Sequence, residues 1–283
     1  MLLLHIGGHE GLHWTPHADV LAMVFLLELA YLFAVTRLRG RFSDAGRVKR
    51  SQIVLFSLGV TVLYIGGGPP VHDLAEHYLL TAHMLQHVAF TLIAAPLLLA
   101  GTPTWLWQAL LRIPGTMPIA RVLTKPLVAF VVFNSVLVLV HLPSTIDLQQ
   151  RQHLFHLFVH VLLLASGLLM WWPILSTLPE LPRVSYPLQM GYLFVQSLLP
   201  AVMASFVTFS ADVVYPFYEQ TPRIAGISPI TDQQIAGGSM KLVGSLILWS
   251  FMAVAFFKWY AQEEGEERGP SWREIEEELE QIV

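Results

Sequence analysis

Two pairs of histidines at helical spacing are the first candidates for chemistry in this sequence. His83 and His87 lie four residues apart in HMLQH, and His156 and His160 repeat the spacing further along the chain. On a helix such pairs share one face, roughly 6 Å apart along the axis. Two pairs from two helices offer four imidazole nitrogens, which suit one metal site or two smaller ones. The alternative is that these imidazoles only make hydrogen bonds that pack the helix ends.

Other residues extend the candidate site. His141 is expected near the same membrane depth as the two pairs. The Met240 thioether suits a soft ion such as Cu(I), although a methionine in an apolar helix more often serves packing. Asp147 and Asp232 are candidate acceptors for imidazole N–H groups. The chain has no cysteine, which excludes disulfides, thiolate ligands and a cysteine nucleophile. Structural roles are favoured for three further histidines: His72, His77 and His153.

The composition indicates that membrane-spanning helices position these residues. The 283-residue chain is 54% hydrophobic and 13% charged, with a mean hydropathy of +0.58, against about 25% charged residues in soluble proteins. It is therefore predicted to be an all-α integral membrane protein, a seven-helix bundle over residues 18–260. A His-rich segment (1–17) precedes the bundle and an acidic tail (261–283) follows it. The predicted spans are residues 19–36, 52–67, 75–99, 126–141, 153–172, 187–209 and 234–259.

The basic residues predict the orientation of this bundle. Thirteen of the sixteen Lys and Arg residues fall in loops at one end, whereas Arg151 and Arg223 are at the other. Since cytoplasmic loops are enriched in Lys and Arg, the N-terminus is expected outside and the C-terminus in the cytoplasm. All twelve histidines then fall in the outer half. Glu28 and Lys241 lie inside spans and need partners there.

Four stretches of the sequence resemble one known family of bacterial plasma-membrane proteins. They are HMLQHVAFTLIAAPLLLAGTP (83–103), HLPSTIDL (141–148), HLFHLFVHVLLLASGLLMWWPIL (153–175) and SPITDQQIAGGSM (228–240). Their order and the flanking spans are similar to the cytochrome c oxidase assembly factor CtaG family. The chain has Val140 where the family usually has an aromatic residue, and Val159 where it usually has Glu.

The resemblance implies a function. It implies a multi-pass protein of the bacterial plasma membrane that is not an enzyme and helps to mature a haem–copper oxidase, with copper as the metal delivered. The implied partners are the lipid bilayer, the oxidase subunits, above all the copper-carrying subunit I, and an extracytoplasmic copper donor. A homo-oligomer stays open, and nucleic acid is not expected. The polar positions that it carries over are His83, Gln86, His87, His141, Asp147, His156, His160, Asp232, Gln233, Gln234 and Met240.

Two other functions fit the same histidines. One is a haem-binding membrane redox protein, because one His from each of two helices could ligate haem iron. The other is a transporter of copper or another metal, which would need polar groups at mid-membrane and on the inner side. A zinc-dependent hydrolase is disfavoured. Residues 9–13, HEGLH, match His-Glu-x-x-His, but they lie in a Gly- and Pro-containing segment that is not expected to form the firm helix this motif needs, and no acidic residue adjoins either of the two histidine pairs.

Overall fold

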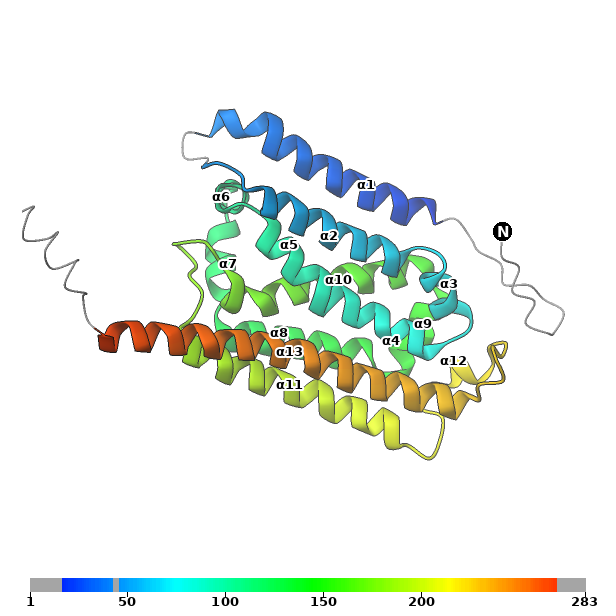
Figure 1. The fold of residues 1–283 in the computed structure, drawn as a ribbon. Helices are drawn as coiled ribbons and strands as arrows, with labels where there is room; N and C mark the ends of the chain where they lie inside the picture. The colour runs from blue at the N-terminus through cyan, green and yellow to red at the C-terminus, as the bar shows by residue number, and fades with distance from the viewer. Residues whose placement is uncertain (1–16, 43–45, 269–283) are drawn as a thin grey trace, which may run out of the picture.

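The chain forms a helical bundle, and no strand occurs in the parts described by this computed structural model, residues 17–42 and 46–268 (Figure 1). The predicted N-terminal segment lies almost wholly outside the described residues, as does most of the tail. The main helices are α1 (Ala18–Phe33), α2 (Arg50–Gly67), α3 (Val71–His77), α4 (Leu80–Val88), α5 (Ala95–Gly101), α6 (Thr104–Leu111), α7 (Thr116–Leu123), α8 (Pro126–Val140), α9 (Pro143–Arg151), α10 (His153–Leu175), α11 (Tyr186–Phe209), α12 (Pro216–Glu219) and α13 (Pro229–Arg268).

Six helical segments of the described chain are long and apolar enough to cross a membrane. A seventh crossing requires α7 and α8 to act together, and these two helices are bent by 84° at the break between them. The prediction of a multi-pass helical protein is confirmed. The prediction of seven spans holds only if this bent pair counts as one.

The predicted third span is not one helix. The helix is interrupted after α3, and α4 begins at Leu80, after two residues that are not helical. A π-helical segment, η3 (Ala89–Ala94), then joins α4 to α5. The two amides that start α4 bond to the side chain of Asp232 on α13, so a distant residue fixes this helix start.

The segment α4–η3–α5 runs through the centre of the bundle. It contacts α2, α10 and α13, while α1 lies outside α2 and α11 pairs with α13 along the opposite side (Figure 1). Its most apolar 18-residue window is 72% buried, against 17–44% in the other five spans. The residues carried by this segment are therefore held by neighbours on several sides.

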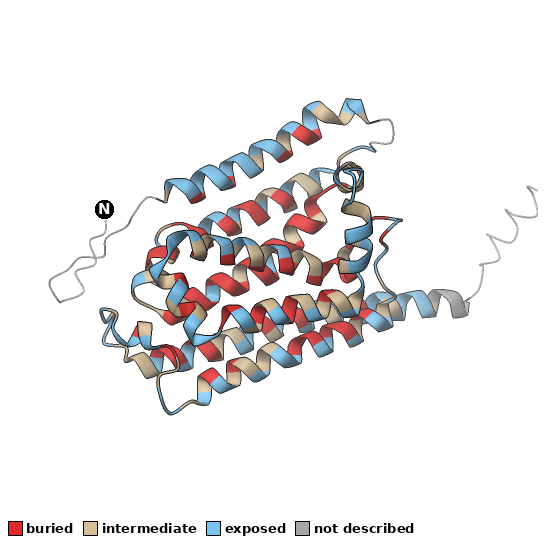
Figure 2. Cartoon of the chain, turned by 180° about the vertical axis from the view of Figure 1, so that it is seen from behind, coloured by how far each residue is buried: buried red, intermediate tan, exposed pale blue. Residues whose placement is uncertain are grey.

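The outer surface of the bundle is apolar and part of its interior is polar, as expected when lipid is the solvent. Phe25, Phe206 and Leu242 are exposed by 59%, 74% and 71%. Gln86 and Gln196, in contrast, are fully buried. Figure 2 shows buried residues on the inward faces of the helices and exposed residues on the outward faces.

Close helix packing depends on glycine at two contacts. A Cβ atom on Gly101 of α5 would lie 2.7 Å from the Cα atom of Phe56 on α2. A Cβ atom on Gly237 of α13 would lie 2.7 Å from the carbonyl oxygen of Ala204 on α11. Small residues let neighbouring backbones approach this closely in membrane bundles.

The two charges within spans contact hydroxyl groups. Glu28 accepts a 2.6 Å hydrogen bond from Ser57, and Lys241 donates a 3.0 Å hydrogen bond to Ser205. Within the described chain neither takes part in an ion pair.

Candidate metal centre

Seven histidines meet at one end of the bundle, the end that carries α3, α9 and α12 (Figure 1). Each ring contacts at least one other, with centroids 4.3–5.9 Å apart. They come from the residue before α1, from α3, from both ends of α4, from the first turns of α10, and from the residue after α8. The cluster is His17, His72, His83, His87, His141, His156 and His160.

Three of these side chains converge closely enough to hold one ion. His72, His156 and His160 each offer a ring nitrogen, and the three nitrogens lie within 4.8 Å of one another. The Nε2 atoms of His156 and His160 are 3.0 Å apart. Nitrogen ligands at about 2.0–2.1 Å in tetrahedral geometry are roughly 3.3 Å from each other. Small side-chain rotations would therefore bring these three nitrogens onto one first-row metal ion.

Glu76 joins two of these histidines. Its Oε1 atom lies 3.1 Å from His72 Nε2 and 3.0 Å from His156 Nδ1. One carboxylate oxygen thus contacts one ring nitrogen of each of these two buried histidines. Glu76 therefore holds both imidazoles in place, as carboxylates do for metal-binding histidines.

The tautomer of His87 follows from its neighbours. His141 Nδ1 lies 2.7 Å from the Leu137 carbonyl oxygen, which can only accept, so this nitrogen carries the hydrogen. His141 Nε2 is then an acceptor, and His87 Nδ1 donates to it over 3.3 Å. His87 Nε2 is left with a free lone pair, buried and without a partner. This is the form of imidazole that binds metals.

His83 is held by side chains of α9 and α12. The amide nitrogen of Gln150 lies 3.2 Å from His83 Nδ1 and 2.7 Å from the Tyr218 hydroxyl. That hydroxyl donates to the carbonyl oxygen of Ala75. Burial, together with the negative charges of Asp232 and Glu76, raises the pKa of Tyr218, so it stays a neutral donor. His83 Nε2 is buried and has no hydrogen-bond partner.

His141 lies just beyond α8 and is buried. Burial lowers its pKa to about 4, since the charged imidazolium is disfavoured there. The ring is therefore neutral near pH 7, which the hydrogen bonds to Leu137 and His87 require.

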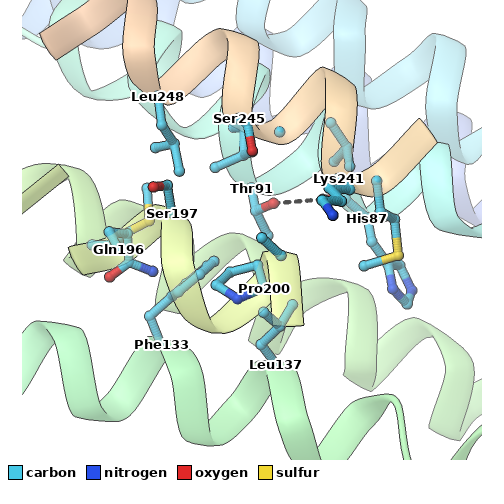
Figure 3. Close-up of a pocket in the computed structure, with 16 residues that line it drawn as sticks. His87, Thr91, Phe133, Leu137, Gln196, Ser197, Pro200, Lys241, Ser245 and Leu248 are labelled. Atoms are coloured by element: carbon cyan, nitrogen blue, oxygen red, sulfur yellow. Dashed lines mark hydrogen bonds between the residues drawn. The ribbon is translucent and has the colours of Figure 1, made fainter. Parts of the chain in front are cut away.

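Met240, on α13, is not part of the histidine cluster but lines a cavity that one of its members, His87, also lines. This small cavity of about 40 Å³ is lined by Thr91 and Lys241 as well. Figure 3 shows side chains of α8, α11 and α13 around this cavity. The cavity is mostly apolar, and Met240 also packs against Leu80, Met84 and their neighbours.

Most of the candidate supporting residues have other partners. Gln86 alone touches the cluster, because its amide nitrogen lies 3.1 Å from His72 Nδ1. Asp147 pairs on the surface with Arg151, which lowers its pKa. Asp232 caps α4, Gln233 bonds to the loop before α12, and Gln234 is exposed.

The structure brings together five of the six candidate ligands, all but Met240, and adds His17, His72 and Glu76. His72 was expected to be structural, Glu76 was not expected as a ligand, and His17 belongs to the His-rich N-terminal segment, for which the sequence leaves open either a polar lead-in or a metal-collecting role. His72 and Glu76 are four residues apart, so a helix predicted over residues 71–77 would have placed them on one face as a candidate pair of ligands. The other two histidines of the described chain have separate partners, because His153 contacts Asp19 and His77 contacts the Asp73 backbone.

A polytopic helical membrane protein with a buried histidine cluster at one end is thus the class of protein defined by the fold and the site. The family model of the cytochrome c oxidase caa3 assembly factor (Caa3_CtaG) matches residues 29–262, and the chain belongs to this family. The resemblance seen in the sequence is thereby confirmed.

Two curated relatives are similar over most of this chain. They are "Uncharacterized protein Mb0105" of Mycobacterium bovis and "Uncharacterized protein MT0111" of Mycobacterium tuberculosis. Each is 26% identical over 245 residues, which cover 80% of this chain and 36% of the relative. The chain thus spans about a third of the length of these relatives. No solved structure matches it.

Proposed function

We propose that this protein binds copper at the histidine cluster and supplies it to a haem–copper oxidase during assembly. The observation that carries the proposal is the convergence of His72, His156 and His160, with ring nitrogens within 4.8 Å of one another. Imidazole suits copper, and the chain has no thiolate that would compete for it. Three neutral ligands leave a coordination position open, which a protein that passes its metal on requires.

The neighbouring histidines complete the proposed site. His83 and His87 each present a buried Nε2 atom without a hydrogen-bond partner, so both are proposed as further ligands. His141 fixes the tautomer of His87, as outer partners of metal-binding histidines do. Met240 is proposed only as a later contact for the ion, since it shares a cavity with His87.

The charge distribution supports a site that faces the outside of the cell. The cluster and the two basic residues Arg151 and Arg223 belong to one end of the bundle, whereas most of the Lys and Arg residues belong to the other. By the rule for basic loops, the histidine end is extracytoplasmic in the bacterial plasma membrane. There it would meet a copper donor and the copper-carrying subunit I of the oxidase. The proposed role is that of a non-catalytic metal carrier, consistent with assembly factors.

The structure favours this reading over haem binding and over transport. Rings of neighbouring histidines touch with centroids 4.3–5.9 Å apart, which leaves no space for a porphyrin between two of them. Beyond the cluster the fully buried polar side chains of the described chain are neutral, such as Asn134 and Gln196, and they lie by a packed apolar core that includes Phe133 and Trp171. A transported metal ion would need charged or metal-binding groups along that route.

The test is the copper content of the purified full-length protein. Wild-type protein is expected to hold about one copper ion for the three-ligand site. A double variant, His156→Ala with His160→Ala, is expected to bind copper about ten- to a hundredfold more weakly, to hold less of it after purification and to leave the oxidase without copper in cells. His153→Ala is the matched control, because His153 lies on the same helix but is exposed and paired with Asp19. Equal copper content in the double variant and in the wild type would reject the proposed site.

A further inference from the structure

The inner three-ligand group is not the only one in the cluster. His17, His72 and Glu76 form a second group whose ligand atoms also lie within 4.8 Å of one another. This outer site (His17, His72, Glu76) and the inner site (His72, His156, His160) share His72. A neutral imidazole has one free lone pair and binds one ion at a time, so the sharing of His72 suits one ion at two positions.

The two sites differ in their exposure. Side-chain exposure is 11% for His17 and 16% for Glu76, but 4% for His72 and 2% for His156. An ion arriving from solvent therefore reaches His17 and Glu76 before it reaches His156. The order of exposure assigns a direction to the pair of sites.

A continuous series of contacts joins the two positions. The rings of His17 and His72 have centroids 4.5 Å apart, and Glu76 Oε1 contacts both His72 Nε2 and His156 Nδ1. His156 Nε2 in turn lies 3.0 Å from His160 Nε2. Glu76 thus reaches a ligand of the inner site while it still belongs to the outer one.

We infer that metal enters through the outer site and passes to the inner site by ligand exchange on His72. The inference rests on the proposed function. In the exchange the bonds from the metal to His17 and Glu76 break, bonds to His156 and His160 form, and the bond to His72 is kept. Where His160 Nε2 carries the hydrogen shared with His156, that hydrogen moves to Nδ1 of the same ring. No electron is transferred and no proton is lost.

The chemistry of the two ligand sets fits this direction. The outer set includes a carboxylate oxygen, which a borderline ion such as Cu²⁺ exchanges for the imidazole nitrogens of the inner set. Asp73 contacts His17 Nε2 at 3.1 Å with its Oδ1 atom, so a carboxylate also holds the outer histidine in place. A chain of few-ligand positions lets an ion move without ever being fully released.

The experiment follows the loading of full-length protein with Cu²⁺ ions alone, by quenching of tryptophan fluorescence and by the nitrogen hyperfine pattern in electron paramagnetic resonance. His17→Ala is expected to reach the wild-type spectrum and stoichiometry, but about tenfold more slowly, since it removes only the outer site. His153→Ala, which removes an equally carboxylate-paired histidine outside the cluster, is expected to load at the wild-type rate.

A second variant stops the ion at the outer site. His160→Asn is expected to retain copper about ten- to a hundredfold more weakly, with mixed nitrogen and oxygen ligands. His72→Ala is expected to lose both positions. Wild-type loading rate in His17→Ala, or no copper in His160→Asn, overturns the inference alone. A wild-type protein that takes up no copper overturns the proposed function and this inference together.

Discussion

The tautomer of His87 is set by two hydrogen bonds that end on a backbone carbonyl. The Leu137 carbonyl fixes the proton of His141, and His141 fixes that of His87. The free lone pair on His87 Nε2 is therefore prepared before any ion arrives. Such preparation lowers the cost of ordering a ligand when the metal binds. It also makes His87 sensitive to a residue that need not touch the metal.

His141 predicts a dependence of stability on pH. Burial lowers its pKa from 6.5 to about 4, so the unfolded chain binds this proton more readily than the folded one. The contribution is fully present above pH 6.5 and is lost as the pH falls toward 4. The gap corresponds to at most about 3 kcal/mol of unfolding free energy. We expect His141→Asn to flatten this fall, as measured by thermal unfolding of the detergent-solubilised protein from pH 7.5 to pH 4. An identical pH profile in the variant would contradict the assignment.

The residue scale also shows how far the sequence predicted the site. The two histidine pairs and His141 could be selected because helical spacing and topology place them on facing surfaces. His72 and Glu76 could not, because a Gly–Pro cluster precedes them and the predicted span begins at Ala75, inside the helix that carries them. Their position depends on where that helix ends, and composition alone does not determine it.

At the scale of elements, the start of α4 is the feature that positions His83 and His87. The Asp232 carboxylate accepts hydrogen bonds from the backbone amides of Leu80 and Thr81 and from the Thr81 hydroxyl. These amides would otherwise be unsatisfied at a buried helix end. A residue of α13 thereby replaces the cap that α4 lacks in its own sequence.

Removing this cap is expected to weaken the bundle. Asp232→Ala leaves two amides without an acceptor, so we expect the free energy of unfolding to fall by about 1–2 kcal/mol. Copper affinity should fall as well, because α4 carries two proposed ligands. Chemical or thermal unfolding in detergent measures the first effect, and copper titration the second.

Asp212→Ala is the matched control for the cap. Asp212 is an exposed aspartate, and within the described chain its backbone carbonyl accepts hydrogen bonds from Ser210 and Gln233. This variant should unfold like the wild type. If both aspartate variants lose the same stability, the loss cannot be ascribed to the capping of α4.

The sequence predicted the elements better than their ends. Long apolar runs identified the six helical segments of the described chain that can cross a membrane, because hydrocarbon thickness sets their length. The interruption of the helix at residues 78–79 was not predicted, because no Gly or Pro occurs there. Its cause is a carboxylate about 150 residues further along the chain, and such long-range capping is invisible to local propensity.

At the scale of the whole molecule, two kinds of residue separate to opposite ends. The nine described histidines belong to the end with α3, α9 and α12, while most of the Lys and Arg residues belong to the end with α6 and α7 (Figure 1). A basic end retained in the cytoplasm would place every imidazole on the outer side. The direction of metal entry proposed above therefore depends on the orientation of the whole bundle.

Single cysteines can test that orientation, because the chain has none of its own. Ser185 and Gln220 are exposed residues on either side of α11 in the sequence. Ser185 directly precedes this helix, and Gln220 follows it beyond the opposite end. We expect a membrane-impermeant thiol reagent to label Gln220→Cys in intact cells, and Ser185→Cys only after the membrane is opened, with the wild-type chain as the unlabelled blank. The reverse pattern would put the histidine cluster in the cytoplasm. Copper would then have to come from a cytoplasmic donor, and the outer site would face the wrong compartment for the role proposed here.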